Sequence, residues 1–238
     1  MKAIVTGHSR GLGAGIARAL LAGGAEVMGL ARHAGDAQPG LRQVALDLAD
    51  ATALQAWLDG GELAAFLGGA QQALLINNAG VVQPVGAPGR LGGAQLAQAV
   101  AVNVSAVLVL TDAFVAATGT CPDRRVLHVS SGAARAPYAG WSTYCATKAA
   151  LDMHARATVL DGVPGLAIAS VAPGVIDTGM QAQIRAMSAR DFPSIERFVA
   201  LQRDGALDDP FAAGARLVAY ALSGAFGREP VTDLRQLR

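Results

Sequence analysis

The sequence is poor in the residues that signal metal sites, disulfide frameworks or binding of polyanions. Its two cysteines, Cys121 and Cys145, form neither a Cys-x-x-Cys pair nor a Cys/His cluster, so we expect no disulfide scaffold, no metal and a reducing cytoplasmic location. The formal net charge is only +1 and no run of Lys or Arg occurs. This balance argues against nucleic acid or a membrane surface as a partner and favours a small neutral or acidic ligand.

Long apolar runs are also missing. No segment has about 18 uninterrupted apolar residues free of Gly, Pro or charge, as a membrane span would require. At the N-terminus, the apolar stretch Ala3-Ile4-Val5 is too short for the core of a signal peptide. With 52% hydrophobic residues over 238 positions, the chain can bury a sizeable core, and we expect a single domain over residues 1–238.

Short runs of Val, Ile and Leu alternate with longer Ala/Leu segments of helical period. This alternation is typical of helices covering both faces of a parallel sheet. It predicts an α/β fold of the Rossmann type, a doubly wound sheet of about seven strands in a three-layer α/β/α arrangement. The expected strands are Lys2–Thr6, Ala25–Leu30, Gln43–Leu46, Leu74–Asn77, Arg125–Ser130, Leu166–Ala172 and Pro230–Asp233.

Three helical regions stand out between these strands. Leu12, Ile16 and Leu20 repeat every four residues, which predicts a helix that ends at the following glycine pair. Leu96 to Ala117 and Ser142 to Leu160 are similarly rich in Ala and Leu. Residues 178–203 mix polar and apolar positions without a strand pattern, so we expect a helical insertion over the carboxyl edge of the sheet.

A glycine-rich turn follows the first strand and opens the first helix, over Thr6 to Gly13. At this place a doubly wound fold directs backbone N–H groups and a positive helix end at a pyrophosphate. Gly7 would permit the tight turn, Gly11 a close approach to phosphate, and Gly13 packing of the helix against the strand. An ordinary glycine-rich turn is the alternative interpretation.

The second strand lacks the Asp or Glu that commonly binds the ribose 2′-hydroxyl of NAD. Arg32 follows that strand and Arg10 lies in the glycine turn, so a 2′-phosphate clamp, and hence NADP(H), is the prediction. Two solvated surface arginines are the alternative. Asp47-Leu48 follows the third strand, where Asp47 would either accept from the adenine amino group or cap a helix.

Tyr144 and Lys148 are four residues apart on a predicted helix, so both side chains project from one face. A nearby Lys⁺ favours phenolate and would lower the pKa of the tyrosine from its usual value near 10. Ser131 lies 13 positions earlier, at the end of a strand, at the sheet edge where such folds bind ligands. A Tyr-x-x-x-Lys pair alone arises often by chance, so its context decides.

That context resembles the short-chain dehydrogenase/reductase family. Six motifs occur in its order and spacing, namely Thr6-Gly-x3-Gly-x-Gly13, Asn77-Asn-Ala-Gly80, Asn103, Ser131, Tyr144-x3-Lys148 and Pro173-Gly174. The resemblance spans nearly the whole chain. It implies an oxidoreductase in which Tyr144 is the general acid, Ser131 donates to the substrate oxygen, Lys148 holds the nicotinamide ribose, and Asn103 kinks a helix and supports a relay water.

The same resemblance implies most of a cofactor site. Asn77 to Gly80 would line its adenine and ribose side, and Pro173 to Thr178 would approach the nicotinamide carboxamide. Together with the residues argued above, the expected cofactor contacts are Gly7, Ser9, Arg10, Gly11, Leu12, Gly13, Arg32, Asp47, Leu48, Asn78, Ala79, Gly80, Tyr144, Lys148, Pro173, Gly174, Val175 and Thr178. Turn, cap and strand-end roles are the alternatives for the asparagines and for Ser131.

Within the family, the segments Ser130–Cys145 and Phe198–Pro210 resemble the branch of benzil and sepiapterin reductases, which implies reduction of vicinal dicarbonyls with NADPH. An apolar pocket wall is expected from Val82, Tyr138, Trp141, Val175, Met180 and Phe192, although Tyr138 and Trp141 would equally pack the loop before the catalytic helix. His8, His33, His128 and His154 are expected to lie apart as loop or packing residues, and Cys145 to face the core.

Two other functions stay open. A 3-oxoacyl thioester reductase would use basic residues at the pocket mouth, for which Arg135, Arg185 and Arg190 are available. A non-catalytic regulator would sense NADP on the same fold. The family resemblance also implies a homodimer or homotetramer, with Leu96–Ala117 and Ser142–Leu160 as the expected interface and a small carbonyl compound as the substrate.

Overall fold

The computed structural model describes residues 1–237 and shows one sheet of seven parallel strands in the order β3-β2-β1-β4-β5-β6-β7. The expected fold class is confirmed. The strand order reverses between β1 and β4, which creates the crevice where such sheets bind ligands. The strands are β1 (Lys2–Thr6), β2 (Glu26–Ala31), β3 (Leu41–Ala45), β4 (Gln72–Asn77), β5 (Asp123–Val129), β6 (Leu166–Ala172) and β7 (Val231–Asp233).

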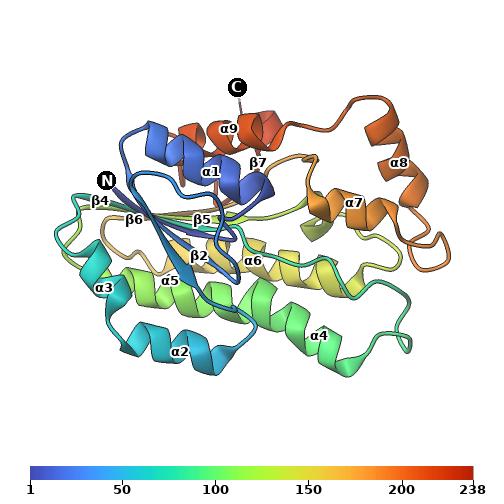
Figure 1. The fold of residues 1–238 in the computed structure, drawn as a ribbon, viewed down its shortest axis with the longest axis horizontal. Coiled ribbons are helices and arrows are strands. Elements are labelled where there is room, and N and C mark those ends of the chain that lie inside the picture. The colour runs from blue at the N-terminus through green and yellow to red at the C-terminus, as the bar shows by residue number, and fades with distance from the viewer. Residues whose placement is uncertain (238) are drawn as a thin grey trace.

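Helices cover both faces of the sheet (Figure 1). On one face lie α1 (Gly11–Ala22) and α9 (Pro210–Leu222). The two helices approach closely because each has a glycine where they cross, Gly15 on α1 and Gly214 on α9. A Cβ on Gly214 would lie 2.5 Å from the backbone of Gly15. The other face carries α2 (Ala51–Asp59), α3 (Glu62–Leu67), α4 (Gly93–Val100), α5 (Ala106–Ala117) and α6 (Ser142–Leu160).

The core is divided by the sheet into two apolar layers. Ile16, Leu20 and Leu217 are fully buried on the α1/α9 side, and Leu110 and Phe114 on the α5 side. Because parallel strands are covered on both faces, their central residues are apolar without alternation, as in Ala3-Ile4-Val5. The core therefore holds the carboxyl edges of β1 to β6 in one plane.

One continuous helical segment, Gly93–Ala117, is long and apolar enough by composition to cross a membrane. Its polar Gln95, Gln98 and Asn103 conceal this in a search for unbroken apolar runs. In this structure the segment is a core helix of the domain, since Ala106, Leu110 and Phe114 pack under the sheet. Length and composition alone are weak evidence for a membrane span.

The insertion expected at 178–203 is helical, as predicted, with α7 (Gly179–Arg185) and α8 (Ile195–Arg203). Figure 1 shows these two helices beyond the sheet's end, and we call residues 178–207 the lid. A short parallel bridge between Ile176 and Asp208 joins the two chain segments that flank the lid, and Asp177 N donates to Asp208 O at 2.9 Å. The lid therefore leaves and rejoins the domain at adjacent positions.

Two of the four histidines lie together, so the expectation that all would lie apart is wrong. His128 Nε2 is 3.0 Å from His154 Nδ1, and His128 Nδ1 is 3.2 Å from the Asn77 side-chain amide. The pair joins β5 to α6. The positions of the two histidines in the sequence, 26 residues apart, did not show that these two elements are in contact. His8 is a packing residue as expected, because its ring would touch a Cβ on Gly29 at 2.2 Å.

Candidate active site

The glycine turn between β1 and α1 has the shape that its sequence predicts. Gly7 and Gly11 adopt left-handed φ angles of 67° and 54°, which favour glycine. A Cβ on Gly13 would lie 2.0 Å from the Gly7 carbonyl oxygen. Gly13 therefore lets the helix approach the turn itself, which corrects the expected packing on the strand.

The turn is tied to the end of β4. The Thr6 hydroxyl accepts from the backbone N–H groups of Asn78 and Ala79, each at 2.9 Å, and the Asn78 side chain donates to the Thr6 carbonyl at 2.9 Å. The Thr178 methyl would lie 3.2 Å from a Cβ on Gly11, which brings the lid's first residue over the turn. Thr6 was not among the expected site residues, although its place at the strand end was a signal.

The two expected phosphate-binding arginines are exposed at this edge. Arg32 immediately follows β2, and Arg10 precedes α1 without a side-chain cap bond. Among residues 1–237, neither forms an ion pair, so both guanidinium groups are available to an anion. Asp47 accepts from Ala49 N at 2.9 Å, and Asp50 rather than Asp47 caps α2.

Apart from Tyr144 and Lys148 on α6, the expected cofactor contacts follow the carboxyl ends of parallel strands. The turns after β1, β2, β3, β4 and β6 carry, in that order, Gly7 to Gly13, Arg32, Asp47 and Leu48, Asn78 to Gly80, and Pro173 to Thr178. Because the strands are parallel, these turns share one edge of the sheet. The structure thus brings the predicted cofactor contacts together at this edge. Helix α6, which carries Tyr144 and Lys148, lies beside them.

Ser131, Tyr144 and Lys148 meet beneath this edge. Ser131 follows β5, and its hydroxyl accepts from Ala133 N at 3.1 Å and acts to lower the pKa of the Tyr144 phenol. Lys148 Nζ donates to the Val129 carbonyl at 2.8 Å and lies 5.8 Å from the centre of the Tyr144 ring. Tyr144 and Lys148 are both buried, so the phenol and ammonium share a low-dielectric site.

Burial, not the neighbouring lysine, dominates the titration of Tyr144. Burial raises the pKa of Tyr144 to about 12, although Ser131 acts in the opposite direction. The expected net lowering of this pKa is therefore wrong for this structure, because burial outweighs the effect of any neighbouring charge. Burial also lowers the pKa of Lys148 to about 8. At neutral pH the site holds a protonated phenol beside a mostly charged ammonium, an arrangement suited to donating a proton.

Asn103 lies where α4 meets α5, in a π-helical segment over Ala101–Ser105. Its Oδ1 accepts from Val81 N and its Nδ2 donates to Val81 O, both at 2.8 Å. Nδ2 also reaches the Thr147 hydroxyl at 3.1 Å. The expected helix distortion at Asn103 is present, and π segments of this kind recur at functional sites. Thr147 was missed, because nothing in its sequence context marked it.

An aromatic cluster lies between Tyr144 and the lid. Trp141 stacks on Phe192 of the lid with ring centres 4.4 Å apart and meets the Tyr144 ring edge-on at 5.3 Å. Val82, Tyr138 and Met180 pack against the same cluster, whereas Val175 does not belong to it. Since Trp141 is 3% exposed, its main contacts are with protein, as the packing interpretation has it. Cys145 is only partly buried, not a core residue.

A cleft of about 480 Å³ opens beside this cluster, between the loop after β4 and the lid. Its lining includes Val85 and Met187, which pack on the same cluster as Tyr144, and the polar Gln83, Gln183 and Asp191. The cleft is therefore a mixed apolar and polar opening beside the aromatic cluster, and the catalytic side chains themselves do not line it.

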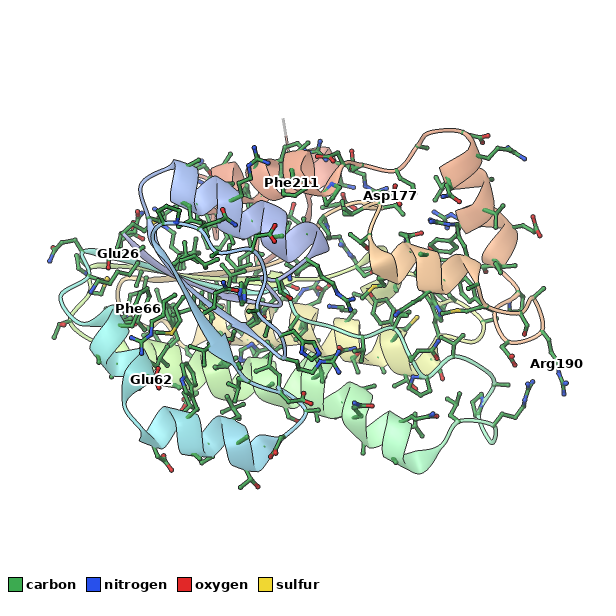
Figure 2. The ribbon with its side chains drawn as sticks, in the orientation of Figure 1. Glu26, Glu62, Phe66, Asp177, Arg190 and Phe211 are labelled. Atoms are coloured by element: carbon green, nitrogen blue, oxygen red, sulfur yellow. The ribbon has the colours of Figure 1, made fainter. Side chains whose placement is uncertain are left out.

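The three arginines considered for a thioester do not converge on this cleft. Arg135 faces Asp152 at 3.7 Å, and Arg185 faces Asp177 at 3.9 Å. Figure 2 shows Arg190 pointing away from the body at the tip of the lid. Two of the three cations are thus opposed by carboxylates, and the third is directed into solvent.

Comparisons with known proteins identify the family of this chain. The family model for short chain dehydrogenase matches residues 1–189. Benzil reductase ((S)-benzoin forming) of Bacillus subtilis (strain 168) is 36% identical over 227 residues, covering 90% of each chain. Sepiapterin reductase of Meriones unguiculatus is 32% identical over 234 residues, covering 90% of this chain and 88% of its own.

A solved structure, a short-chain dehydrogenase/reductase SDR from Burkholderia vietnamiensis, is 45% identical and covers 100% of this chain and 98% of its own, with a TM-score of 0.71. Sequence motifs, fold and relatives thus point the same way. The chain belongs to the short-chain dehydrogenase/reductase family and is an oxidoreductase acting on carbonyl or alcohol groups.

Proposed function

We propose that this protein is an NADPH-dependent reductase that converts a carbonyl, including one carbonyl of a vicinal diketone, to an alcohol with Tyr144 as the general acid. The observation that carries the proposal is the buried Tyr144–Lys148 pair, with Lys148 Nζ 5.8 Å from the centre of the Tyr144 ring and Ser131 acting on the phenol from the end of β5. These groups lie at the sheet edge that also bears the glycine turn, so a bound carbonyl and a bound nicotinamide would meet there.

Each residue has a task that its surroundings support. Tyr144 keeps its proton well above neutral pH and donates it to the carbonyl oxygen as charge develops. The Ser131 hydroxyl donates a second hydrogen bond to that oxygen. Lys148 stays mostly charged at neutral pH, which favours the phenolate that donation leaves behind. Asn103 fixes Val81 and Thr147 next to the lysine.

The residues present fit NADPH. The left-handed Gly7 and Gly11 shape a tight turn at the start of α1, and backbone N–H groups there suit a pyrophosphate. No carboxylate follows β2 to meet a 2′-hydroxyl, and the unpaired Arg10 and Arg32 suit a 2′-phosphate. Asn78 to Gly80, Pro173 to Val175 and Thr178 would hold the remainder. When bound, the cofactor supplies the hydride.

The diketone is favoured over a thioester by charge and by relatives. An acyl group carried on a protein or coenzyme A brings phosphates, and Arg135 and Arg185 already face carboxylates. The Bacillus relatives are named as benzil reductases, and the cleft of about 480 Å³ beside an aromatic cluster is large enough for an aromatic diketone. The non-catalytic regulator is disfavoured because Ser131, Tyr144 and Lys148 are all present in register.

The test is to follow oxidation of NADPH and of NADH by the purified protein with aromatic diketones, pterins, aldehydes and acyl thioesters. We expect diketone turnover with NADPH, a loss of about 10²–10⁴-fold in Tyr144→Phe with NADPH affinity retained, and no loss in Tyr220→Phe, whose ring lies on α9. Arg32→Ala should weaken NADPH binding and leave NADH binding unchanged.

Three outcomes contradict the proposal. Turnover of thioesters without diketones would replace the substrate class, and equal use of NADH would remove the 2′-phosphate clamp. NADPH binding with no turnover on the whole panel would favour the regulator.

We further propose that the protein is a cytoplasmic homodimer or homotetramer, assembled through the outer faces of α5 and α6. Leu108, Val109, Met153 and Leu160 are exposed there, Leu160 to 86%, and such a group of apolar side chains marks an association surface. Sedimentation should show a dimer or tetramer that dissociates in Val109→Glu but not in Val199→Glu, which alters an exposed valine on α8. A monomeric wild-type protein would contradict this.

A further inference from the structure

A buried carboxylate lies outside the predicted site but on the catalytic helix. Asp152 is one turn after Lys148 on α6 and is only 6% exposed. Its Oδ1 accepts hydrogen bonds from the Ser130 hydroxyl and the Ser170 hydroxyl, both at 2.7 Å. The two serines come from the ends of β5 and β6, so Asp152 fastens the catalytic helix to two strands.

The hydrogen bonds alone do not require a charge at this position. A neutral Asn or Ser would also accept from the two hydroxyls, and burying a carboxylate is costly without full pairing. The second oxygen, Oδ2, has no hydrogen-bond partner among residues 1–237. The nearest cation outside the helix is Arg135, whose Nε lies 3.7 Å from Oδ2 and whose side chain is 36% exposed. The charge therefore has a use other than anchoring.

That use is found at Lys148. Asp152 acts on Lys148 to raise its pKa against the larger, opposite effect of burial. The groups facing Lys148 from other elements bring no second anion: His128 on β5 is kept neutral because burial lowers its pKa to about 3, and Asn103 is uncharged. Tyr144 on the same helix is protonated at neutral pH.

The charged groups nearby on β7 and after β5 interact with one another. Asp233 of β7 pairs with Arg235 at 2.6 Å, and Arg135 also acts on Asp233. The Arg135 side chain donates to the Thr232 carbonyl at 3.3 Å. Among the described residues, Asp152 is thus the only carboxylate that acts on the catalytic lysine.

We propose that Asp152 is a positioning residue of this reductase, a fixed anion that keeps Lys148 charged and so supports proton donation by Tyr144. The proposal rests on the proposed function for its catalytic consequence. Its electrostatic part concerns Lys148 itself and is open to measurement without any turnover. The Ser130 and Ser170 hydroxyls hold the carboxylate on the lysine's side of α6 and stabilise its charged form.

The chain offers a direct measurement, because Lys2 and Lys148 are its only lysines. Protein labelled with ¹³C at lysine Cε gives two NMR signals, which Lys2→Arg assigns. We expect the Lys148 signal of the wild-type protein to titrate near pH 8 and that of Asp152→Asn to titrate lower by about one pH unit, as expected when an opposite charge within one helical turn is removed. Lys2 serves as the internal reference, and its titration should not move.

Ser170→Ala is the matched control. It removes one hydrogen bond to Asp152 but leaves the anion, so the Lys148 titration should stay near that of the wild-type protein. Should Asp152→Asn fail to fold, Asp152→Ser makes the same comparison, because its hydroxyl still bonds to the strand serines. Equal Lys148 titrations in the wild-type protein and the neutral variant would overturn the proposal.

Turnover then separates this proposal from the proposed function. With NADPH and a diketone, the alkaline decline of kcat should begin about one pH unit lower in Asp152→Asn than in the wild-type protein, whereas a merely structural role would reduce activity equally at every pH. An unchanged pH profile would refute the catalytic part. If the wild-type protein turns over no carbonyl, the proposed function fails while the NMR result for Asp152 still stands or falls by itself.

Discussion

The pair of His128 and His154 predicts that the free energy of unfolding falls in mild acid, by an amount that can be worked out from the structure. The Thr111 hydroxyl donates to Val107 O at 2.7 Å, so it accepts from the Asn77 amide nitrogen at 3.3 Å. The same nitrogen then donates to His128 Nδ1 at 3.2 Å, which leaves the proton on Nε2 to be donated to His154 Nδ1 at 3.0 Å. A second proton on His128 would face the Asn77 N–H group, so the folded ring resists protonation.

The magnitude follows from linkage. Burial lowers the pKa of His128 from its ordinary value of 6.5 to about 3, so the unfolded chain binds more protons than the folded one between these values. Stability is therefore fully present above pH 6.5 and is lost as the pH falls, by about 1.4 kcal/mol per pH unit. Between pH 6.5 and 5.0 the free energy of unfolding should drop by about 2 kcal/mol from this residue. His154, whose pKa burial also lowers, adds with the same sign.

Urea unfolding at several pH values tests the reasoning. The carboxylates with lowered pKa, Asp123, Asp191 and Asp233, lose their contribution as the pH falls below about 4, outside the chosen interval. His128→Gln should flatten the slope between pH 6.5 and 5.0, whereas His33→Gln, at an exposed position, should leave it unchanged. A slope in His128→Gln as steep as that of the wild-type protein would refute the assignment.

Three further predictions follow from the packing and the site. Gly214→Ala should lower the free energy of unfolding by about 1–3 kcal/mol, because its Cβ would lie 2.5 Å from the Gly15 backbone. Gly132→Ala is the control, since open space surrounds Gly132, and it should leave the free energy of unfolding unchanged. Denaturant unfolding of the two variants tests this difference. Phe192→Ala removes a fully buried ring from the lid cluster and should cost about 3–5 kcal/mol as well as raising KM for a diketone, measured by melts and kinetics. Carbonyl reduction should be level up to about pH 8 and fall above it as Lys148, whose pKa burial lowers to about 8, loses its charge; a level rate to pH 10 would contradict this.

Local sequence patterns predicted most of the fold, because the apolar runs and glycine turns of this chain coincide with its buried strands and the turns that follow them. β1 and β6 were predicted with their observed bounds, since each is a mainly apolar run followed directly by Gly7 or Pro173. β3 begins two residues earlier than expected, because its Arg42 is exposed at the sheet edge and does not look like part of a buried strand. The glycine turn and Tyr144-x3-Lys148 were visible because their spacing is itself the signal.

What the sequence did not reveal depends on contacts between distant segments. His128 and His154 meet only because β5 packs on α6, which no local period reports. The raised pKa of Tyr144 reflects burial by Trp141 and its neighbours, and a Tyr-x-x-x-Lys spacing carries no information about burial. Asp152 was passed over because an acidic residue on a helix is ordinarily solvated, and only the strand-end hydroxyls show that this one is not.

The serine doublet at the end of β5 shows how one strand end can serve two purposes. Ser130 and Ser131 are adjacent in the chain but serve two different residues of the catalytic helix. Ser131 acts on the pKa of the Tyr144 phenol, and Ser130 donates a hydrogen bond to the Asp152 carboxylate at 2.7 Å. Both partners belong to α6, eight residues apart, and Lys148 lies midway between them. A shift of this strand end would therefore displace the proton donor and the anion behind the lysine together, which couples the geometry of the phenol to the charge that supports it.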